Sequence, residues 1–141
     1  MKKLFLFLFF LIMQSGSLFS QINLNIENIK ENEGNILVAV YNSAEDFLNA
    51  EKAFLKTVFP ITSNPLQVIL PIYSKGKYAI AIFHDEDSNN KLNTYFGIPT
   101  EPYGFSQNKN GGMFGPPKFN ETHFDYLGVD LNIDIKLTKI L

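Results

Sequence analysis

The chain has 141 residues, no cysteine and a formal net charge of −2, and 45% of its side chains are hydrophobic. This length allows one domain with a substantial core, and the absence of cysteine excludes disulfide bonds. The acidic balance excludes the basic surface that nucleic-acid binding needs and argues against binding to anionic membranes.

Residues 1–20 show the features of a cleavable secretory signal. Two lysines precede an apolar run at residues 4–13, and small or polar residues follow, so that cleavage can fall after Ser17 or Ser20. The run is too short for a membrane-spanning helix, which needs about 20 residues. We therefore expect an exported protein, periplasmic or extracellular, with no membrane anchor after cleavage. The remaining residues 21–141 are expected to form a single domain, with a net charge of about −4.

Period-two patterns predict strands along most of this domain. A short first strand lies within residues 21–28, and residues 35–41 form a nearly continuous apolar run, which is typical of a central strand covered on both faces. Residues 66–70 and 77–83, separated by a turn, are expected to pair with each other. Strict alternation over residues 129–137 predicts a half-exposed last strand.

The stretch with helical character is residues 44–57, where Phe47, Leu48, Phe54 and Leu55 stand among charged residues. It predicts one short helix or a helical loop. Strands separated by turns, with at most one helix, indicate an all-β fold, an antiparallel β-sandwich.

Residues 84–119 have no sustained period of either kind and are rich in glycine, proline and aromatic residues. Disordered linkers are poor in aromatic residues, and structureless loops of this length are uncommon in compact domains unless they are functional. We therefore expect a long ordered loop that folds over one end of the sandwich.

The run YAIAIFHDEDSNNKLNTYFGIPTEPYGFS at residues 78–106, with FGPPKF at residues 114–119, resembles the bacterial family called domain of unknown function 2141 (DUF2141). The resemblance extends from about residue 34 to residue 137. It implies an exported domain with a transthyretin-like or immunoglobulin-like β-sandwich and no established activity. The chain departs from the family's usual pattern, in which a glycine is expected at Asn90, an acid at Asn93 and one more residue before Gly97, and these departures weaken the case for a shared metal site.

The acidic loop, residues 85–93, has the spacing of the first half of a calcium loop. An EF-hand takes oxygen ligands from positions 1, 3, 5, 7 and 9, and the corresponding residues are Asp85, Asp87, Asn89, Lys91 through its carbonyl, and Asn93. The twelfth position is Phe96 instead of the usual Glu, so Glu101 is the candidate for a remote ligand. This spacing allows a weak calcium site, with a Kd in the range of about 10⁻⁴ to 10⁻³ M. The alternative is a solvated turn held by side-chain-to-backbone hydrogen bonds.

Four aromatic residues follow the acidic loop and could form an exposed surface for a glycan or peptide: Tyr95, Phe96, Tyr103 and Phe105. The alternative is that they attach the loop to the core.

Catalytic signals are weaker. Each histidine, His84 and His123, stands near an aspartate, but neither has the further nitrogen or sulfur ligands of a zinc site. Ser88 and Ser106 lie in no nucleophile motif. We therefore expect a non-catalytic binding or structural module for an unidentified small molecule, glycan or protein. The alternative is a small metal-dependent or carboxylate-based hydrolase of cell-envelope material.

Overall fold

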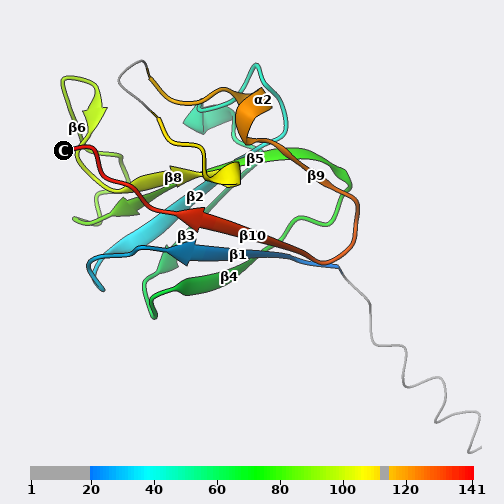
Figure 1. Cartoon of the computed structure of the whole chain (residues 1–141), viewed down its shortest axis with the longest axis horizontal. Helices are drawn as coiled ribbons and strands as arrows, with labels where there is room; N and C mark the ends of the chain where they lie inside the picture. Colours follow the sequence, from blue (N-terminus) through cyan, green and yellow to red (C-terminus); the bar gives the residue numbers. More distant parts are fainter. Residues whose placement is uncertain (1–19, 112–114) are drawn as a thin grey trace, which may run out of the picture.

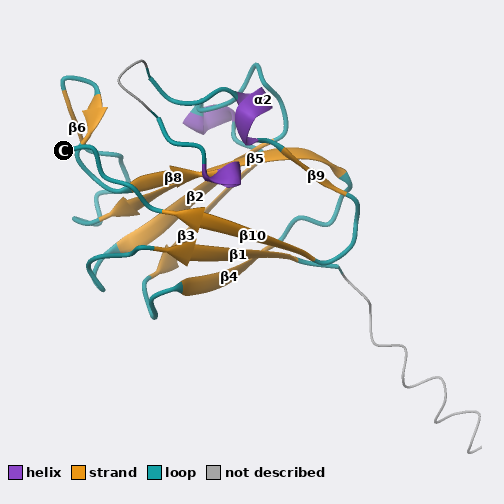
Figure 2. Ribbon diagram, viewed as in Figure 1, coloured by secondary structure: helices purple, strands orange, loops and turns teal. Residues whose placement is uncertain are grey.

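The computed structural model describes residues 20–111 and 115–141, so the predicted signal lies almost entirely outside the described residues. These residues form two facing β-sheets, a separate two-stranded hairpin and connecting loops (Figures 1 and 2). The elements in chain order are β1 (Ile22–Glu27), β2 (Asn35–Tyr41), η1 (Ala50–Lys52), β3 (Leu55–Pro60), β4 (Leu66–Leu70), β5 (Gly76–Asp85), β6 (Thr94–Tyr95), β7 (Ile98–Pro99), β8 (Tyr103–Phe105), η2 (Ser106–Asn108), α2 (Phe119–Thr122), β9 (Phe124–Tyr126) and β10 (Leu131–Lys136). No helix among them is long and apolar enough to span a membrane.

The smaller sheet has three strands in the order β10-β1-β4. The first and last strands of the domain pair in parallel, whereas β1 and β4 are antiparallel. Alternation divides each strand between two environments, because Ile22, Leu24 and Ile26 point into the core while Asn23 and Asn25 point outward. The outward asparagines donate hydrogen bonds to the facing residues of β10, which supports this register over a shifted one.

The larger sheet has the order β3-β2-β5-β8, and β9 also pairs with β5. Here β2 lies between two strands, as its continuous apolar sequence predicts. Its inward residues Ile36, Val38 and Val40 meet Ile80 and Ile82 of β5 in the core between the sheets. This arrangement confirms the predicted all-β sandwich, with one parallel strand pair in an otherwise antiparallel fold.

The outer face of the larger sheet is covered by an aromatic layer. Rings from β2 and β8 meet rings from the loop after β2 and from the region around α2, and both of these segments lie over the sheet in Figure 1. Ring-to-ring contacts with centroid distances of 5.4 to 6.4 Å connect the members of the layer, which are Tyr41, Phe47, Tyr103, Phe105 and Phe119. Both faces of the larger sheet are therefore buried over part of its area.

One sequence prediction about local structure is wrong, and another holds except at its end. Residues 44–57 form a loop with one 3-10 turn, in keeping with the short helix or helical loop expected there, but the last residues of this segment begin β3. In β3, half-buried and exposed positions alternate, and pairing with β2 outweighs the weak helical pattern. Residues 66–70 and 77–83 do not pair with each other, because β4 joins β1 in one sheet while β5 joins β2 in the other.

Candidate metal-binding loop and aromatic hairpin

The acidic loop begins where β5 ends, and β5 delivers Asp85 to the edge of the sandwich. The side chain is fully buried, and its two carboxylate oxygens accept hydrogen bonds from the backbone amides of Asn89 and Asn90 at 3.0 and 2.8 Å. The Asp85 backbone can lie this close to residue 34 because that residue is glycine: a Cβ atom at Gly34 would lie 2.3 Å from the Asp85 carbonyl oxygen. The loop is thus folded around the first predicted ligand.

Left-handed backbone at two residues produces the tight path of the loop. Ser88 has a φ of 58° and Asn90 a φ of 62°. Asn90 occupies the position where calcium loops carry glycine, and asparagine is among the residues that accept this conformation. The departure from glycine at this position therefore leaves the turn intact.

Asp87 is the exposed member of the loop's carboxylates. It accepts hydrogen bonds from the side-chain amides of Asn93 and Asn89, each at 2.9 Å, and from the backbone amide of Asn89 at 3.2 Å. The hydrogen bond from Asn93 is the main cause that lowers the pKa of Asp87. Desolvation, the next-largest effect, opposes it, and the interactions with Asn89 and Asp85 lower the pKa further. Lys91 is exposed, and its backbone amide donates to the Asn89 side chain at 2.7 Å.

Glu101, the predicted remote ligand, folds back onto the loop. Its side chain is 2% exposed, and its carboxylate accepts hydrogen bonds from the backbone amides of Glu86 at 3.0 Å and Asn93 at 2.8 Å. This carboxylate ties the start of the acidic loop to its end.

We call Asp85, Asp87 and Glu101 the acidic cluster. One carboxylate oxygen from each lies within 4.8 Å of the others, as in a site that could hold a metal ion. Among the described residues, no lysine or histidine forms an ion pair with Asp85 or Glu101, and Lys139 pairs with Glu86 beside the cluster at 3.4 Å. Two buried carboxyl groups and one exposed carboxyl group thus lie together without a cationic side chain paired to Asp85 or Glu101.

The aromatic residues divide into two groups. Tyr103 and Phe105 are 5% and 7% exposed within the aromatic layer, so they do not contribute to an exposed binding face. Tyr95 and Phe96 are 64% and 88% exposed. The predicted aromatic surface is therefore reduced to the latter pair.

The exposed pair forms one side of the aromatic hairpin, residues 94–99, built from β6 and β7. Phe96 and Gly97 are its two turn residues and have φ values of 49° and 78°, the backbone signs of a type I′ turn. Gly suits such a position, but a phenylalanine in the left-handed region costs roughly 1–2 kcal/mol. Phe96 at the tip of the hairpin therefore has a strained backbone and a nearly fully exposed ring.

The histidines lie outside the acidic cluster. His84 is fully buried, and its Nε2 donates to the Glu33 carbonyl at 2.7 Å. His123 stacks on Phe119 with a ring-centroid distance of 5.6 Å and an interplanar angle of 9°. In the described part of the chain, neither histidine joins a group of three metal-ligating side chains. Both have structural contacts.

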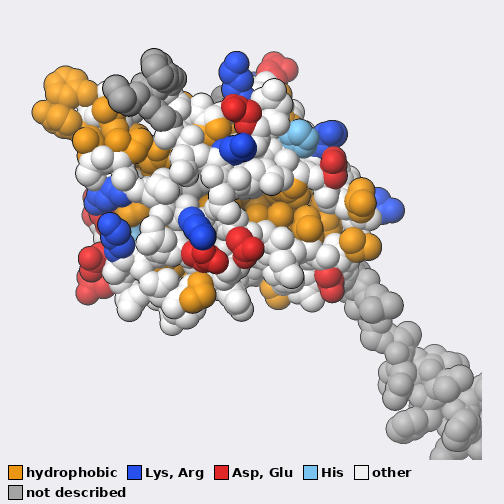
Figure 3. Space-filling view, in the orientation of Figure 1, with side chains coloured by type: hydrophobic (Ala, Val, Ile, Leu, Met, Phe, Trp, Pro, Cys, Tyr) orange, Lys and Arg blue, Asp and Glu red, His pale blue; other side chains and the backbone are white. Residues whose placement is uncertain are grey.

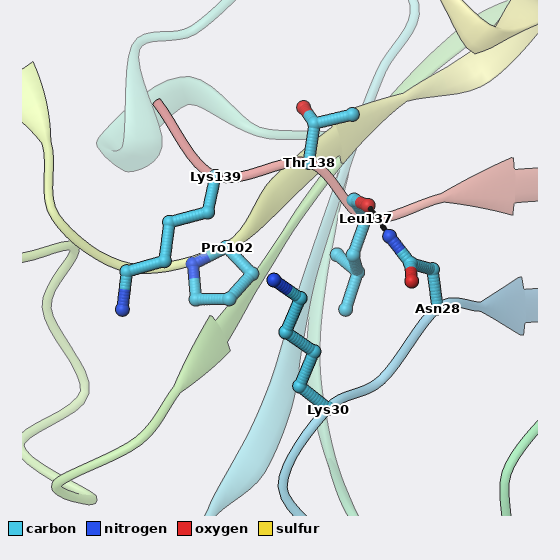
Figure 4. A pocket seen from close by; sticks show the side chains of 6 residues that line it. All are labelled: Asn28, Lys30, Pro102, Leu137, Thr138 and Lys139. Atoms are coloured by element: carbon cyan, nitrogen blue, oxygen red, sulfur yellow. Dashed lines mark hydrogen bonds between the residues drawn. The ribbon is translucent and has the colours of Figure 1, made fainter. Parts of the chain in front are cut away.

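A small pocket that the sequence did not indicate lies between the residues that follow β1, Pro102 and the residues that follow β10. It measures about 260 Å³, and Pro102 and Leu137 form part of its wall (Figure 4). Lys30 and Lys139 also line the pocket. The side-chain amide of Asn28 donates a hydrogen bond to the Leu137 carbonyl at 2.7 Å. The volume is just below the usual range for ligand sites, about 300–1,000 Å³. Lysines far apart in the sequence meet here only through folding.

Fold and site together define a β-sandwich with a carboxylate cluster at the end of β5 and an aromatic hairpin beside it. The family model described as an uncharacterized protein conserved in bacteria, DUF2141, matches residues 24–134. The chain therefore belongs to the DUF2141 family, as its motifs predict. No curated protein and no solved structure matches it, so the transthyretin-like or immunoglobulin-like form of the sandwich stays a prediction.

Proposed function

We propose that this protein is an exported, non-catalytic binding or structural module in which calcium occupies the acidic cluster. The observation that carries the proposal is the convergence of three carboxylates within 4.8 Å, two of them buried. Buried charges are costly unless they are paired or coordinate a metal. A divalent cation would supply the positive charge that the surrounding side chains do not.

The existing hydrogen bonds are compatible with a metal ion. An ionised carboxylate has about four lone-pair sites, and each oxygen of Asp85 and Glu101 accepts one backbone amide. A lone pair on each oxygen therefore stays available. Calcium is a hard cation that prefers such oxygen ligands and tolerates irregular geometry, which suits a loop that lacks the second half of an EF-hand.

Calcium would also order the element next to the cluster. Asn93 donates through its backbone to Glu101 and through its side chain to Asp87, and its carbonyl accepts from the Thr100 amide at 2.9 Å. Because Asn93 and Thr100 flank the aromatic hairpin, a cation in the cluster would hold the base of the hairpin. This supports a module that presents an ordered loop to a ligand.

The test is thermal melting of the mature protein during a calcium titration, with Asp87→Asn and Asp85→Ala. At a calcium concentration ten times the Kd, the stabilisation is about 1.4 kcal/mol, or a rise in Tm of roughly 4–8 °C. We expect this rise in the unmodified protein and little or none in the two variants. The matched control is Asp125→Asn, which removes an exposed carboxylate paired with Lys77 at 3.6 Å.

Asp87→Asn is the more informative variant, because Asp87 is exposed and its amide replacement is nearly isosteric. It should fold without calcium and lose the response to calcium. If millimolar calcium leaves Tm unchanged in the unmodified protein and in both cluster variants, or raises it equally in all of them, the metal proposal is wrong.

A further inference from the structure

We propose that the tip of the aromatic hairpin inserts into the interface of a zwitterionic lipid bilayer. Insertion of the tip would not require calcium in the acidic cluster. Phe96 combines near-complete exposure with a left-handed backbone that favours other residues. Asn-Gly is the preferred pair for a type I′ turn, so an apolar ring at this position opposes both local stability and solubility. Such a conflict points to a role at the exposed ring itself.

The apolar character extends around the tip. Tyr95 lies against Phe96 with a centroid distance of 4.6 Å, and its cross-strand partner Ile98 is 40% exposed. Leu92, just before the hairpin, is 36% exposed. Figure 3 shows hydrophobic side chains gathered over the end of the molecule where β6 projects in Figure 1. The tip is thus a small apolar projection and not an isolated side chain.

Geometry argues against a sugar as the occupant. The rings of Tyr95 and Phe96 meet edge-to-face at 76°, so they do not form a flat platform for a sugar ring. Phe96 also has no hydrogen-bonding group for hydroxyls. Hydrophobic contact is the interaction that this ring can offer.

Size argues against a stable protein interface at the tip alone. Two aromatic rings at these exposures present on the order of 200–400 Å². A specific protein complex buries about 800 Å² on each partner. A lipid interface, in contrast, accepts a small projection without a complementary surface, and a Tyr beside a Phe suits the boundary between headgroups and acyl chains.

The negative charge of the domain bears on which lipid headgroups the tip can approach. Residues 21–141 carry a net charge of about −4, and the acidic cluster lies at the base of the hairpin, to which Asn93 connects it. Anionic headgroups would be repelled by these charges. The surface therefore fits a zwitterionic bilayer such as phosphatidylcholine, with weak and reversible binding.

The test uses the absence of tryptophan from the chain. In Phe96→Trp, the introduced indole reports directly on the tip. In the control Ile69→Trp, it reports on an exposed position of β4 in the three-stranded sheet, away from the hairpin. With phosphatidylcholine vesicles in chelator-containing buffer, we expect a blue-shifted emission and quenching by brominated lipid for Phe96→Trp and neither effect for Ile69→Trp. The chelator keeps this result separate from the calcium proposal.

Cosedimentation with the same vesicles compares the unmodified protein with Phe96→Asn. Asparagine fits the turn better than phenylalanine, so this variant should fold at least as well as the unmodified protein. The fraction bound to vesicles should nevertheless fall about tenfold, because the variant lacks the ring that would be buried in the lipid. Equal binding of both proteins would overturn the proposal, as would equal shifts at both tryptophan positions. A Phe96→Trp emission that responds to soluble oligosaccharides and not to vesicles would assign the tip to a sugar and also overturn it.

Discussion

Gly34 and Gly97 provide a paired test of how the acidic loop is positioned. Both have a left-handed backbone, with φ values of 80° and 78°. They differ in their surroundings, because a Cβ at Gly34 would lie 2.3 Å from the Asp85 carbonyl oxygen, whereas a Cβ at Gly97 would meet nothing within 4 Å. Alanine at each position therefore has the same conformational cost, but only at Gly34 does it also have a steric one.

The conformational cost of alanine in this region is roughly 1–2 kcal/mol. Overpacking adds typically 1–3 kcal/mol, and the clashing atom at Gly34 belongs to backbone, which cannot rotate away. We expect Gly34→Ala to lower the free energy of unfolding by about 2–5 kcal/mol and Gly97→Ala by no more than about 1–2 kcal/mol. Urea unfolding at pH 7 measures both values.

The same pair tests the link to the metal site. Gly34→Ala must displace Asp85, so the Tm increase at millimolar calcium should shrink in Gly34→Ala and persist in Gly97→Ala. Equal destabilisation by the two substitutions would show that backbone conformation alone matters at Gly34. A full calcium response in Gly34→Ala would refute the argument that this glycine positions the ligand.

Two further predictions concern the region around the aromatic layer. Ser106 is fully buried, accepts from the Ile80 amide at 2.9 Å and donates to the Thr122 carbonyl at 2.6 Å, so Ser106→Ala should cost about 2–4 kcal/mol in urea unfolding; a loss below about 0.5 kcal/mol would contradict this. Burial raises the pKa of Tyr41 above its usual value near 10. Its contribution to stability is therefore complete below pH 10 and is lost as pH rises through the folded-state pKa. The urea midpoint should fall above pH 10, less steeply in Tyr41→Phe than in the control Tyr95→Phe, and identical pH profiles would exclude this origin.

Much of the fold could be read from local patterns. The alternation in residues 131–136 and the continuous apolar run at 35–41 predicted strands that the structure contains, because side-chain direction in a strand follows directly from sequence position. The segment at 44–57 has the loop with a helical turn that its pattern predicted, but the pattern did not show that its end begins β3. Nor did it show that Phe47 contacts Phe105 and Phe119 in the aromatic layer, because these two rings come from distant parts of the chain.

The candidate site also has features that the sequence predicted and features that only the fold decided. The oxygen-rich spacing from Asp85 to Asn93 and the choice of Glu101 as a distant partner came from residue types, and the structure brings the carboxylates together. Which aromatic residues are exposed could not be predicted. Tyr103 and Phe105 belong to a strand that pairs with β5, while Phe96 occupies a turn, and only these placements separate buried from exposed rings.

The sequence by itself determined the family, the all-β class and the positions of most strands, because these depend on motifs and on periodicity between near neighbours. Only the tertiary structure decided that β4 and β5 lie in different sheets, that β1 and β10 pair in parallel, and that Lys30 and Lys139 line one pocket. These features depend on contacts between residues far apart in the chain. Such contacts are selected by the packing of the whole core, which no local pattern records.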